Sequence, residues 1–347
     1  MSLFRRLRAT MTRHKNDAVI LKNCLRDVSR LPSIPLTEVE TAELMHYYER
    51  FGITPTVRFY EVSKGLGIPF NPQLLPADFY FRSVIPFLIR PSSWQIDDKN
   101  MYDTYFPDVL RPKTIAKKIG QRYYDAANMP ICSNAFLDKV SNSMPCILKK
   151  STGVGCGTGI MVLKKSDDML ALKNLDFDYI IQTLACNHPN LIWTNTKALC
   201  TLRVYTLRYY EKTIVTATAL RVGGVDSFVD NLCAGGVVIR VDEETGTTVG
   251  GAFSLSSGFS DSFNGGAKPH GHRIPFFQEA KDLCVHLCER FPISLSIGWD
   301  VAITEKGPML IECNLPGSDI NIVQLACKKP FLGEFTETIL AEMMGNR

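Results

Sequence analysis

The stretch GWDVAITEKGPMLIECN, residues 298–314, decides the fold. Two short apolar segments flank the turn residues 305–307, a pattern typical of a β-hairpin. A three-residue loop whose final glycine is in the left-handed region would place Thr304 opposite Pro308. The sequence therefore predicts two antiparallel strands with a register fixed by this turn.

The predicted register sets two carboxylates against each other inside an apolar hairpin. Asp300 lies opposite Glu312, and Asn314 shares the face of Glu312 because side chains alternate along a strand. Opposed carboxylates repel, and burial raises the cost. A hard cation removes both problems, since two carboxylates and an amide oxygen suit Mg²⁺. The alternative is an open, solvated hairpin without a metal, but apolar neighbours such as Val301 and Leu310 argue against it.

The composition is that of an ordinary globular protein. The chain has 347 residues, 45% hydrophobic and 21% charged, which is enough for two or three subdomains. No apolar run has the length of a membrane span, and the start MSLFRRLRATMTRHK lacks the apolar core of a signal peptide. Eleven scattered cysteines indicate reduced thiols and predict a cytoplasmic location. The net charge of +4, without a basic stripe or zinc-finger motif, argues against a nucleic-acid partner.

Patterns along the chain indicate three regions. Residues 1–95 are predicted to be mainly helical. Residues 96–175 contain short helices, the strand MPCILKK, a glycine loop and the strand GIMVLKK. Residues 176–347 are rich in strands, with helices at 276–290 and about 331–344. Because this order is not a series of βαβ units, it predicts an α+β fold with antiparallel sheets.

A glycine-rich loop follows the first of these strands. Lys149 lies at the end of the strand and precedes STGVGCGTG, residues 151–159. Backbone amides in such a loop can face phosphate oxygens, although the pattern is not a Walker loop. A glycine-rich hairpin turn is the alternative interpretation. Lys149, at the end of the strand that leads into the loop, favours a phosphate site.

Two arginines interrupt apolar strand segments further along. Arg203 is in CTLRVYTL and Arg221 is in ATALRVGG. They could face outward from half-exposed strands, or they could form a clamp for phosphate or carboxylate. In VDNLCAGG, Asp230 and Asn231 precede a glycine pair that would let the backbone approach a ligand.

The order of these blocks resembles the ATP-grasp superfamily, and most closely its sugar-transfer-associated branch. The similar blocks are IDDKNMY, MPCILKKSTGVGCGTGI, IIQTL, TLRVYTL, ALRVGG, VDNLCAGG and IGWDVAITEKGPMLIECNLPG, over roughly residues 97–317. The resemblance implies an ATP-grasp fold, with two α+β lobes that grip ATP. The small lobe would be residues 96–175 with the glycine flap, and the large lobe residues 176–347 with the Mg²⁺ site. Lys150 departs from the family pattern, which usually has proline there.

The resemblance also implies a role for individual residues. The residues matched to nucleotide binding are Lys99, Lys149, Gly155, Gly157, Gln182, Thr183, Leu184 and His188. The residues matched to positions beside the γ-phosphate and the acceptor are Arg203, Arg221 and Asn231. The residues matched to the magnesium ligands are Asp300, Glu312 and Asn314. ATP and Mg²⁺ are therefore the expected cofactors.

The activity implied by the resemblance is that of an ATP-dependent carboxylate–amine ligase that forms an acylphosphate. Its expected partners are a small-molecule carboxylate and an amine, with a uronic acid, a sugar acid or a sugar nucleotide of surface polysaccharide assembly as candidates. One alternative is a kinase that phosphorylates a hydroxyl group. Another is a nucleotide-binding scaffold without turnover, which retention of both lysines and all three metal ligands argues against.

Overall fold

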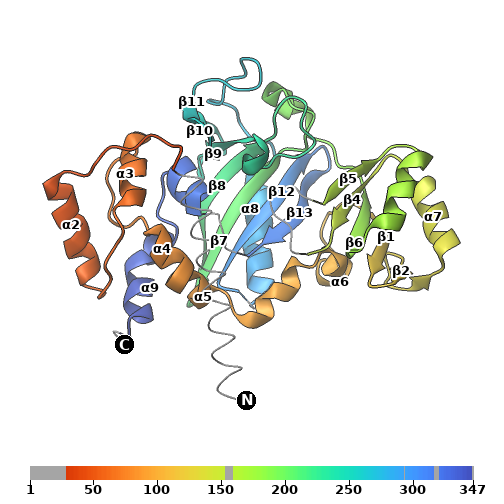
Figure 1. The fold of residues 1–347 in the computed structure, drawn as a ribbon, viewed down its shortest axis with the longest axis horizontal. Helices are drawn as coiled ribbons and strands as arrows, with labels where there is room; N and C mark the ends of the chain where they lie inside the picture. The colour runs from red at the N-terminus through yellow and green to blue at the C-terminus, as the bar shows by residue number, and fades with distance from the viewer. Residues whose placement is uncertain (1–28, 153–158, 293, 316–319, 346–347) are drawn as a thin grey trace.

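The computed structural model describes residues 29–152, 159–292, 294–315 and 320–345. Two antiparallel sheets lie side by side, and the N-terminal helices flank the larger sheet on the side away from the smaller one (Figure 1). This mixture of helices and antiparallel sheets confirms the predicted α+β class. Within these ranges no helix has the length and apolar character needed to cross a membrane.

The smaller sheet has six strands in the order β3-β2-β1-β6-β4-β5. The strands are β1 (Thr114–Ile119), β2 (Arg122–Tyr124), β3 (Pro130–Ile131), β4 (Cys146–Lys150), β5 (Ile160–Leu163) and β6 (Tyr179–Thr183). Helix α7 (Ser133–Ser141) contributes Phe136 and Val140 to a core shared with Leu148. The boundary predicted after residue 175 is misplaced with respect to β6, which lies between β1 and β4. The apolar pattern of that strand suits either sheet, so the sequence does not reveal which strands it pairs with.

The larger sheet has seven strands in the order β11-β10-β9-β8-β7-β12-β13. The strands are β7 (Thr201–Tyr209), β8 (Lys212–Val222), β9 (Val237–Val241), β10 (Thr248–Ser254), β11 (Gly258–Ser260), β12 (Ser296–Thr304) and β13 (Gly307–Asn314). Both faces are covered, so successive residues such as Val204 and Tyr205 enter different cores. Helix α8 (Phe277–Arg290) packs on the face of the sheet that carries the Val204 side chain.

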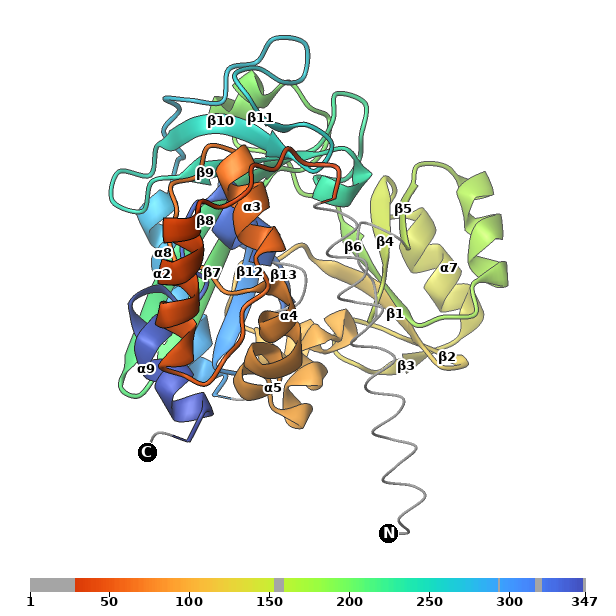
Figure 2. The ribbon, with the colours of Figure 1, turned by 60° about the vertical axis from the view of Figure 1, so that its left-hand side comes forward.

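The opposite face of the larger sheet is covered by the N-terminal helices and the C-terminal segment. The elements are α2 (Glu38–Glu49), α3 (Arg58–Gly65), α4 (Ala77–Phe79), η1 (Tyr80–Val84), α5 (Ile85–Leu88), η7 (Asn321–Ala326), η8 (Gly333–Phe335) and α9 (Thr336–Met343). Figure 2 shows α2 and α3 in front of this sheet. Tyr48 and Tyr80 are buried in one core with Tyr205 of β7. The described part of the N-terminal region is therefore helical, as predicted, and shares its core with the larger sheet.

Further short helices lie in the segments between these elements. They are η2 (Pro91–Asp97), η3 (Lys99–Met101), α6 (Tyr102–Tyr105), η4 (Ser166–Asn174), η5 (Pro189–Thr194) and η6 (Leu232–Ala234). Of these, η2 packs against β13 of the larger sheet and η3 against β6 of the smaller sheet. The segment from η2 to α6 therefore contacts both sheets.

Candidate active site

The hairpin of β12 and β13 brings Asp300 opposite Glu312, as the sequence predicts. The predicted turn is wrong in detail, because Thr304 lies opposite Gly307 and not opposite Pro308. The loop therefore has two residues, and a register shift next to Asp300 supplies the extra residue on β13. A third loop residue and a register shift would each add one residue on the side of β13. The pairing of Asp300 with Glu312 is therefore the same in both cases.

Asp300 is neutralised by the two strand arginines. It pairs with Arg203 across β12 and β7, and Arg203 Nη2 donates to Asp300 Oδ2 at 2.9 Å. Arg221 Nη1 donates to the same oxygen at 2.8 Å. Burial opposes the charged form of Asp300, but the two guanidinium groups outweigh it and lower the pKa of the carboxyl. The arginines therefore do not face outward; they form a carboxylate clamp, and the carboxylate in this structure is that of Asp300.

A further acid, Asp230, completes this cluster. Arg221 Nη2 lies 3.3 Å from Asp230 Oδ1, and the Thr201 hydroxyl donates to the other carboxylate oxygen. Burial and the charge of Asp300 raise the pKa of Asp230, although Arg221 opposes the shift. Sequence reasoning misses Asp230 as a site residue. The available signal is its place in VDNLCAGG, directly before Asn231.

The two candidate phosphate lysines gather near Glu312. Lys99 Nζ lies 2.7 Å from Glu312 Oε1, so this ion pair joins η3 to the hairpin. Burial disfavours the charge on Lys99, but Glu312 outweighs it and raises the pKa of the lysine. Lys149, buried at the end of β4, has its pKa lowered to about 8 by burial and by the charge of Lys99, against the attraction of Glu312. Gly155 and Gly157 of the flap lie outside the described residues.

The predicted hinge residues connect the two sheets. Thr183 N–H donates to Lys113 O at 2.9 Å, and its hydroxyl accepts from Lys113 N–H at 3.0 Å, which fixes the end of β6 to the segment before β1. Gln182 is buried, whereas Leu184 is 41% exposed. His188 N–H then donates to Ile303 O of β12 at 2.7 Å. The chain therefore passes from one sheet to the other between Thr183 and His188, where the hinge is predicted.

Asn231 and Gly236 form a compact turn beside Asp230. The Asn231 side chain accepts from Cys233 N–H at 3.0 Å, and its main-chain carbonyl accepts from Gly236 N–H at 3.0 Å. A Cβ at Gly236 would lie 2.8 Å from Asn231 O and 2.9 Å from Val222 O. The role of Asn231 beside the acceptor stays a prediction, because in this structure its amide oxygen caps the turn.

The oxygen donors of the hairpin are of the chemical type that a hard cation binds. Asp300, Glu312 and Asn314 offer two carboxylates and an amide oxygen, and Asn314 Nδ2 donates to Asp300 Oδ2 at 3.2 Å. Glu312 is the more accessible acid, with 24% of its side chain exposed against 5% for Asp300. Within the described ranges no group of three or more His, Cys, Asp or Glu side chains has the geometry of a metal site. The hairpin set, with only two acids and one amide, is not such a group, but its oxygen donors suit Mg²⁺.

Residues 96–339 match the model of a protein family described as sugar-transfer associated ATP-grasp. The chain belongs to this family. The match begins at η2, includes both sheets and ends in α9, so it contains every candidate site residue. The family assignment confirms the predicted ATP-grasp fold, and it supports ATP and Mg²⁺ as the cofactors of the site.

The ATP-grasp chain is also similar to individual proteins of known structure. No curated protein matched it. Among solved structures it is similar to the D-alanine-D-alanine ligase of Coxiella burnetii, with 9% identity, a TM-score of 0.43 and coverage of 74% of this chain and 60% of that one. It is similar to D-alanyl-alanine synthetase A of Vibrio cholerae O1, with 12% identity, a TM-score of 0.42 and coverage of 74% and 66%. A carboxyaminoimidazole ribonucleotide synthase from Aspergillus clavatus, complexed with ATP, matches with 16% identity and a TM-score of 0.41. The match covers 64% of this chain and 44% of the synthase, which is less than half of its length.

Proposed function

We propose that this ATP-grasp protein is an ATP-dependent ligase that joins a carboxylate to an amine through an acylphosphate. The observation that carries the proposal is the series of ion-paired side chains at the open end of the β12–β13 hairpin. Lys99 pairs with Glu312, and both Arg203 and Arg221 pair with Asp300, at the junction of the two sheets. Alternating anionic and cationic groups of this kind suit a nucleotide triphosphate, a divalent cation and an anionic acceptor.

The proposed nucleotide site lies between the lobes. Lys99 and Lys149 would bind the phosphates, and the backbone of residues 182–184 would hold adenine beside the hinge. Asp300, Glu312 and Asn314 would hold Mg²⁺, which when bound supplies charge neutralisation at the transferring phosphoryl group. The ion pair between Lys99 and Glu312 supports this arrangement, because it sets a phosphate-binding cation and a metal-binding acid 2.7 Å apart.

The proposed chemistry needs no dedicated nucleophile from the protein. An oxygen of the substrate carboxylate attacks the γ-phosphorus, and ADP leaves. The amine nitrogen then attacks the acyl carbon, the bond from that carbon to the phosphate oxygen breaks, and the nitrogen loses a proton. Arg203 and Arg221 would stabilise negative charge on the acyl and phosphoryl oxygens. Their hydrogen bonds to Asp300 orient them before substrate arrives.

The proposed acceptor is a uronic-acid or other sugar-linked carboxylate used in surface polysaccharide assembly in the cytoplasm. The description of the family as sugar-transfer associated supports this class, and the support is by analogy. The two arginines of the proposed site suit an anionic acceptor, because their guanidinium groups lie beside the proposed metal ligand Asp300.

A hydroxylamine trap tests the reaction class. The protein is incubated with Mg-ATP, hydroxylamine and pools of uronates, sugar nucleotides and amino acids, while ADP and hydroxamate are measured. Hydroxamate formed together with ADP is the expected result, because hydroxylamine intercepts an acylphosphate. ADP with a stable phosphorylated product and no hydroxamate would establish the kinase alternative instead. Binding of Mg-ATP without ADP release in any pool would favour the scaffold, and Glu312→Gln serves as the inactive control.

A further inference from the structure

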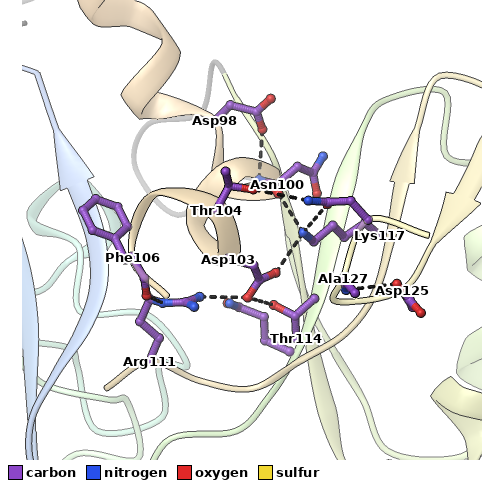
Figure 3. A network of polar contacts seen from close by, with 12 residues as sticks. Asp98, Asn100, Asp103, Thr104, Phe106, Arg111, Thr114, Lys117, Asp125 and Ala127 are labelled. Atoms are coloured by element: carbon purple, nitrogen blue, oxygen red, sulfur yellow. Dashed lines mark hydrogen bonds and ion pairs between the residues drawn. The ribbon is translucent and has the colours of Figure 1, made fainter. Parts of the chain in front are cut away.

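Lys117 of β1 is a fully buried lysine whose amine is surrounded by oxygen acceptors. Its side chain has 0% exposure. Lys117 Nζ lies 2.8 Å from Asp103 Oδ2, donates to the main-chain carbonyl of Asn100 at 2.8 Å and donates to Asn128 Oδ1 at 2.8 Å. Figure 3 shows this network between the segment 98–106 and the smaller sheet. The contacts with Asn100 and Asn128 are hydrogen bonds and the contact with Asp103 is an ion pair, so the protein itself neutralises the buried ammonium group.

Asp103 of α6 is the counter-ion that offsets the cost of burying the Lys117 ammonium group. Arg111 Nη1 donates to Asp103 Oδ1 at 3.0 Å, and the Thr114 hydroxyl donates to the same oxygen at 3.1 Å. Burial opposes the charge on Asp103, but the hydrogen bonds from Lys117, Arg111 and Thr114 lower the pKa of the carboxyl. The ion pair fixes α6 to β1.

The same network fixes the backbone that carries Lys99. The Asn100 carbonyl held by Lys117 is one residue from Lys99, and Lys99 N–H donates to Ser151 O at 3.1 Å. The Asn100 side-chain amide is 1% exposed and makes no hydrogen bond within the described residues. The main-chain carbonyl, and not the side chain of Asn100, is therefore the anchor on this side.

The segment is attached to the larger sheet as well. Tyr102 OH accepts from Cys313 N–H at 3.0 Å, next to Glu312 on β13. Lys99 Nζ contacts Glu312 itself. Residues 99–103 are therefore held between β1 and β13, and on the side of the smaller sheet the contact is the ion pair between Asp103 and Lys117 of β1.

We propose that Lys117, through its contacts with Asp103 and the Asn100 carbonyl, is a positioning residue that sets where Lys99 meets the nucleotide phosphates. The proposal rests on the nucleotide site proposed above. Lys117 touches neither phosphate nor metal; it acts through Lys99. The same strand offers a matched control in Lys118, which is also buried and donates to Leu175 O at 2.9 Å, within the smaller sheet and its turns.

The experiment compares Lys117→Met with Lys118→Met by calorimetric titration with Mg-ADP, together with a melting curve for each variant. Both variants lose a buried ammonium group, so both are expected to melt at a lower temperature. Only Lys117→Met is expected to weaken Mg-ADP binding, by about tenfold or more, at a temperature where all proteins are folded. If Lys117→Met does not fold, the double variant Asp103→Asn with Lys117→Met, which also removes the carboxylate charge that has lost its lysine partner, takes its place.

A double-mutant cycle separates positioning from a general structural effect. If Lys117 acts through Lys99, Lys117→Met causes no further loss of Mg-ADP affinity in a Lys99→Met background, so the two losses are not additive. Additive losses, or equal affinities of Lys117→Met and Lys118→Met, would overturn the inference and leave the proposed function standing. Absence of Mg-ADP binding by the unchanged protein would overturn both.

Discussion

Arg203 and Asp300 face each other across neighbouring strands β7 and β12, with Arg203 Nη2 donating to Asp300 Oδ2 at 2.9 Å. Both side chains are buried, with 7% and 5% exposure. A buried carboxylate is stable only when it is paired, so Asp300 depends on its arginines whether or not a cation is bound. Glu312, on the adjacent strand, is more accessible and its ion-pair partner is Lys99. The two acids of the hairpin are therefore expected to respond differently to substitution.

Asp300→Asn is expected to lower the free energy of unfolding by about 3 kcal/mol, because it leaves two buried guanidinium groups with less compensating charge. The lowered pKa of Asp300 means that its contribution is present above the unfolded-state pKa and is lost as the pH falls through the folded-state pKa. Urea denaturation at pH 7 and at acidic pH measures both effects. A variant as stable as the unchanged protein at pH 7 would contradict the role of the ion pairs.

Glu312→Gln is expected to abolish turnover and to weaken Mg²⁺-dependent nucleotide binding, with a smaller effect on folding than Asp300→Asn. The reason is that Glu312 is partly exposed and its substitution removes one oxygen charge that faces the proposed cation. Nucleotide binding is titrated with and without Mg²⁺, and stability by urea denaturation. Glu305→Gln in the exposed turn of the same hairpin is the matched control. Normal turnover in the Glu312 variant would remove this residue from the site.

The hairpin could be predicted from the sequence because its signal is local. The turn lies between Asp300 and Glu312. The two acids face each other whether the extra residue belongs to the loop or to a register shift in β13. The carboxylate clamp was one of two interpretations of Arg203 and Arg221, and strand order decides between them by bringing β7 between β8 and β12.

The remaining features depend on contacts between residues that are far apart in the sequence. The buried Lys117 interrupts the apolar pattern of β1, so neither the strand nor the network could be predicted from alternation. Its acceptors come from Asn100, Asp103 and Asn128, three segments whose proximity only the fold determines. Asp230 likewise becomes a site residue only because Thr201 and Arg221 lie opposite each other on paired strands.

Gly236→Ala is expected to reduce turnover by up to about 100-fold. A Cβ at this position lies too close to three main-chain oxygens, so the turn beside Asp230 must shift. The oxygens belong to Asn231, Val222 and Asp230, at 2.8, 2.9 and 3.0 Å. Gly224→Ala is the control, since a Cβ there meets nothing within 4 Å. Turnover and melting temperature are measured for both. Equal turnover in the two variants would show that the Gly236 turn does not position the site.

Lys149 is expected to give the proposed nucleotide site a pH dependence. Burial and the nearby charge of Lys99 lower the pKa of Lys149 to about 8, with Glu312 opposing, whereas phosphate binding requires the charged amine. The dissociation constant of Mg-ADP is therefore expected to be steady at neutral pH and to rise above about pH 8, by up to about tenfold per pH unit. The free energy of unfolding is expected to depend on pH in the opposite direction. Burial of the charged amine costs stability below about pH 8, and this cost diminishes as the pH rises toward the unfolded-state value of 10.5.

The measurement is a series of Mg-ADP titrations between pH 7 and 9.5 with the unchanged protein, Lys149→Met and Lys150→Met. Lys150 is the next residue on β4, and its amine lies 5.5 Å from the centre of the Phe177 ring. Lys149→Met is expected to bind more weakly and to lose the alkaline rise, because the titrating amine is gone. Lys150→Met is expected to keep the rise, since other titrating groups are common to both variants. An alkaline rise that persists in Lys149→Met would assign the titration to another group and contradict the role of this lysine.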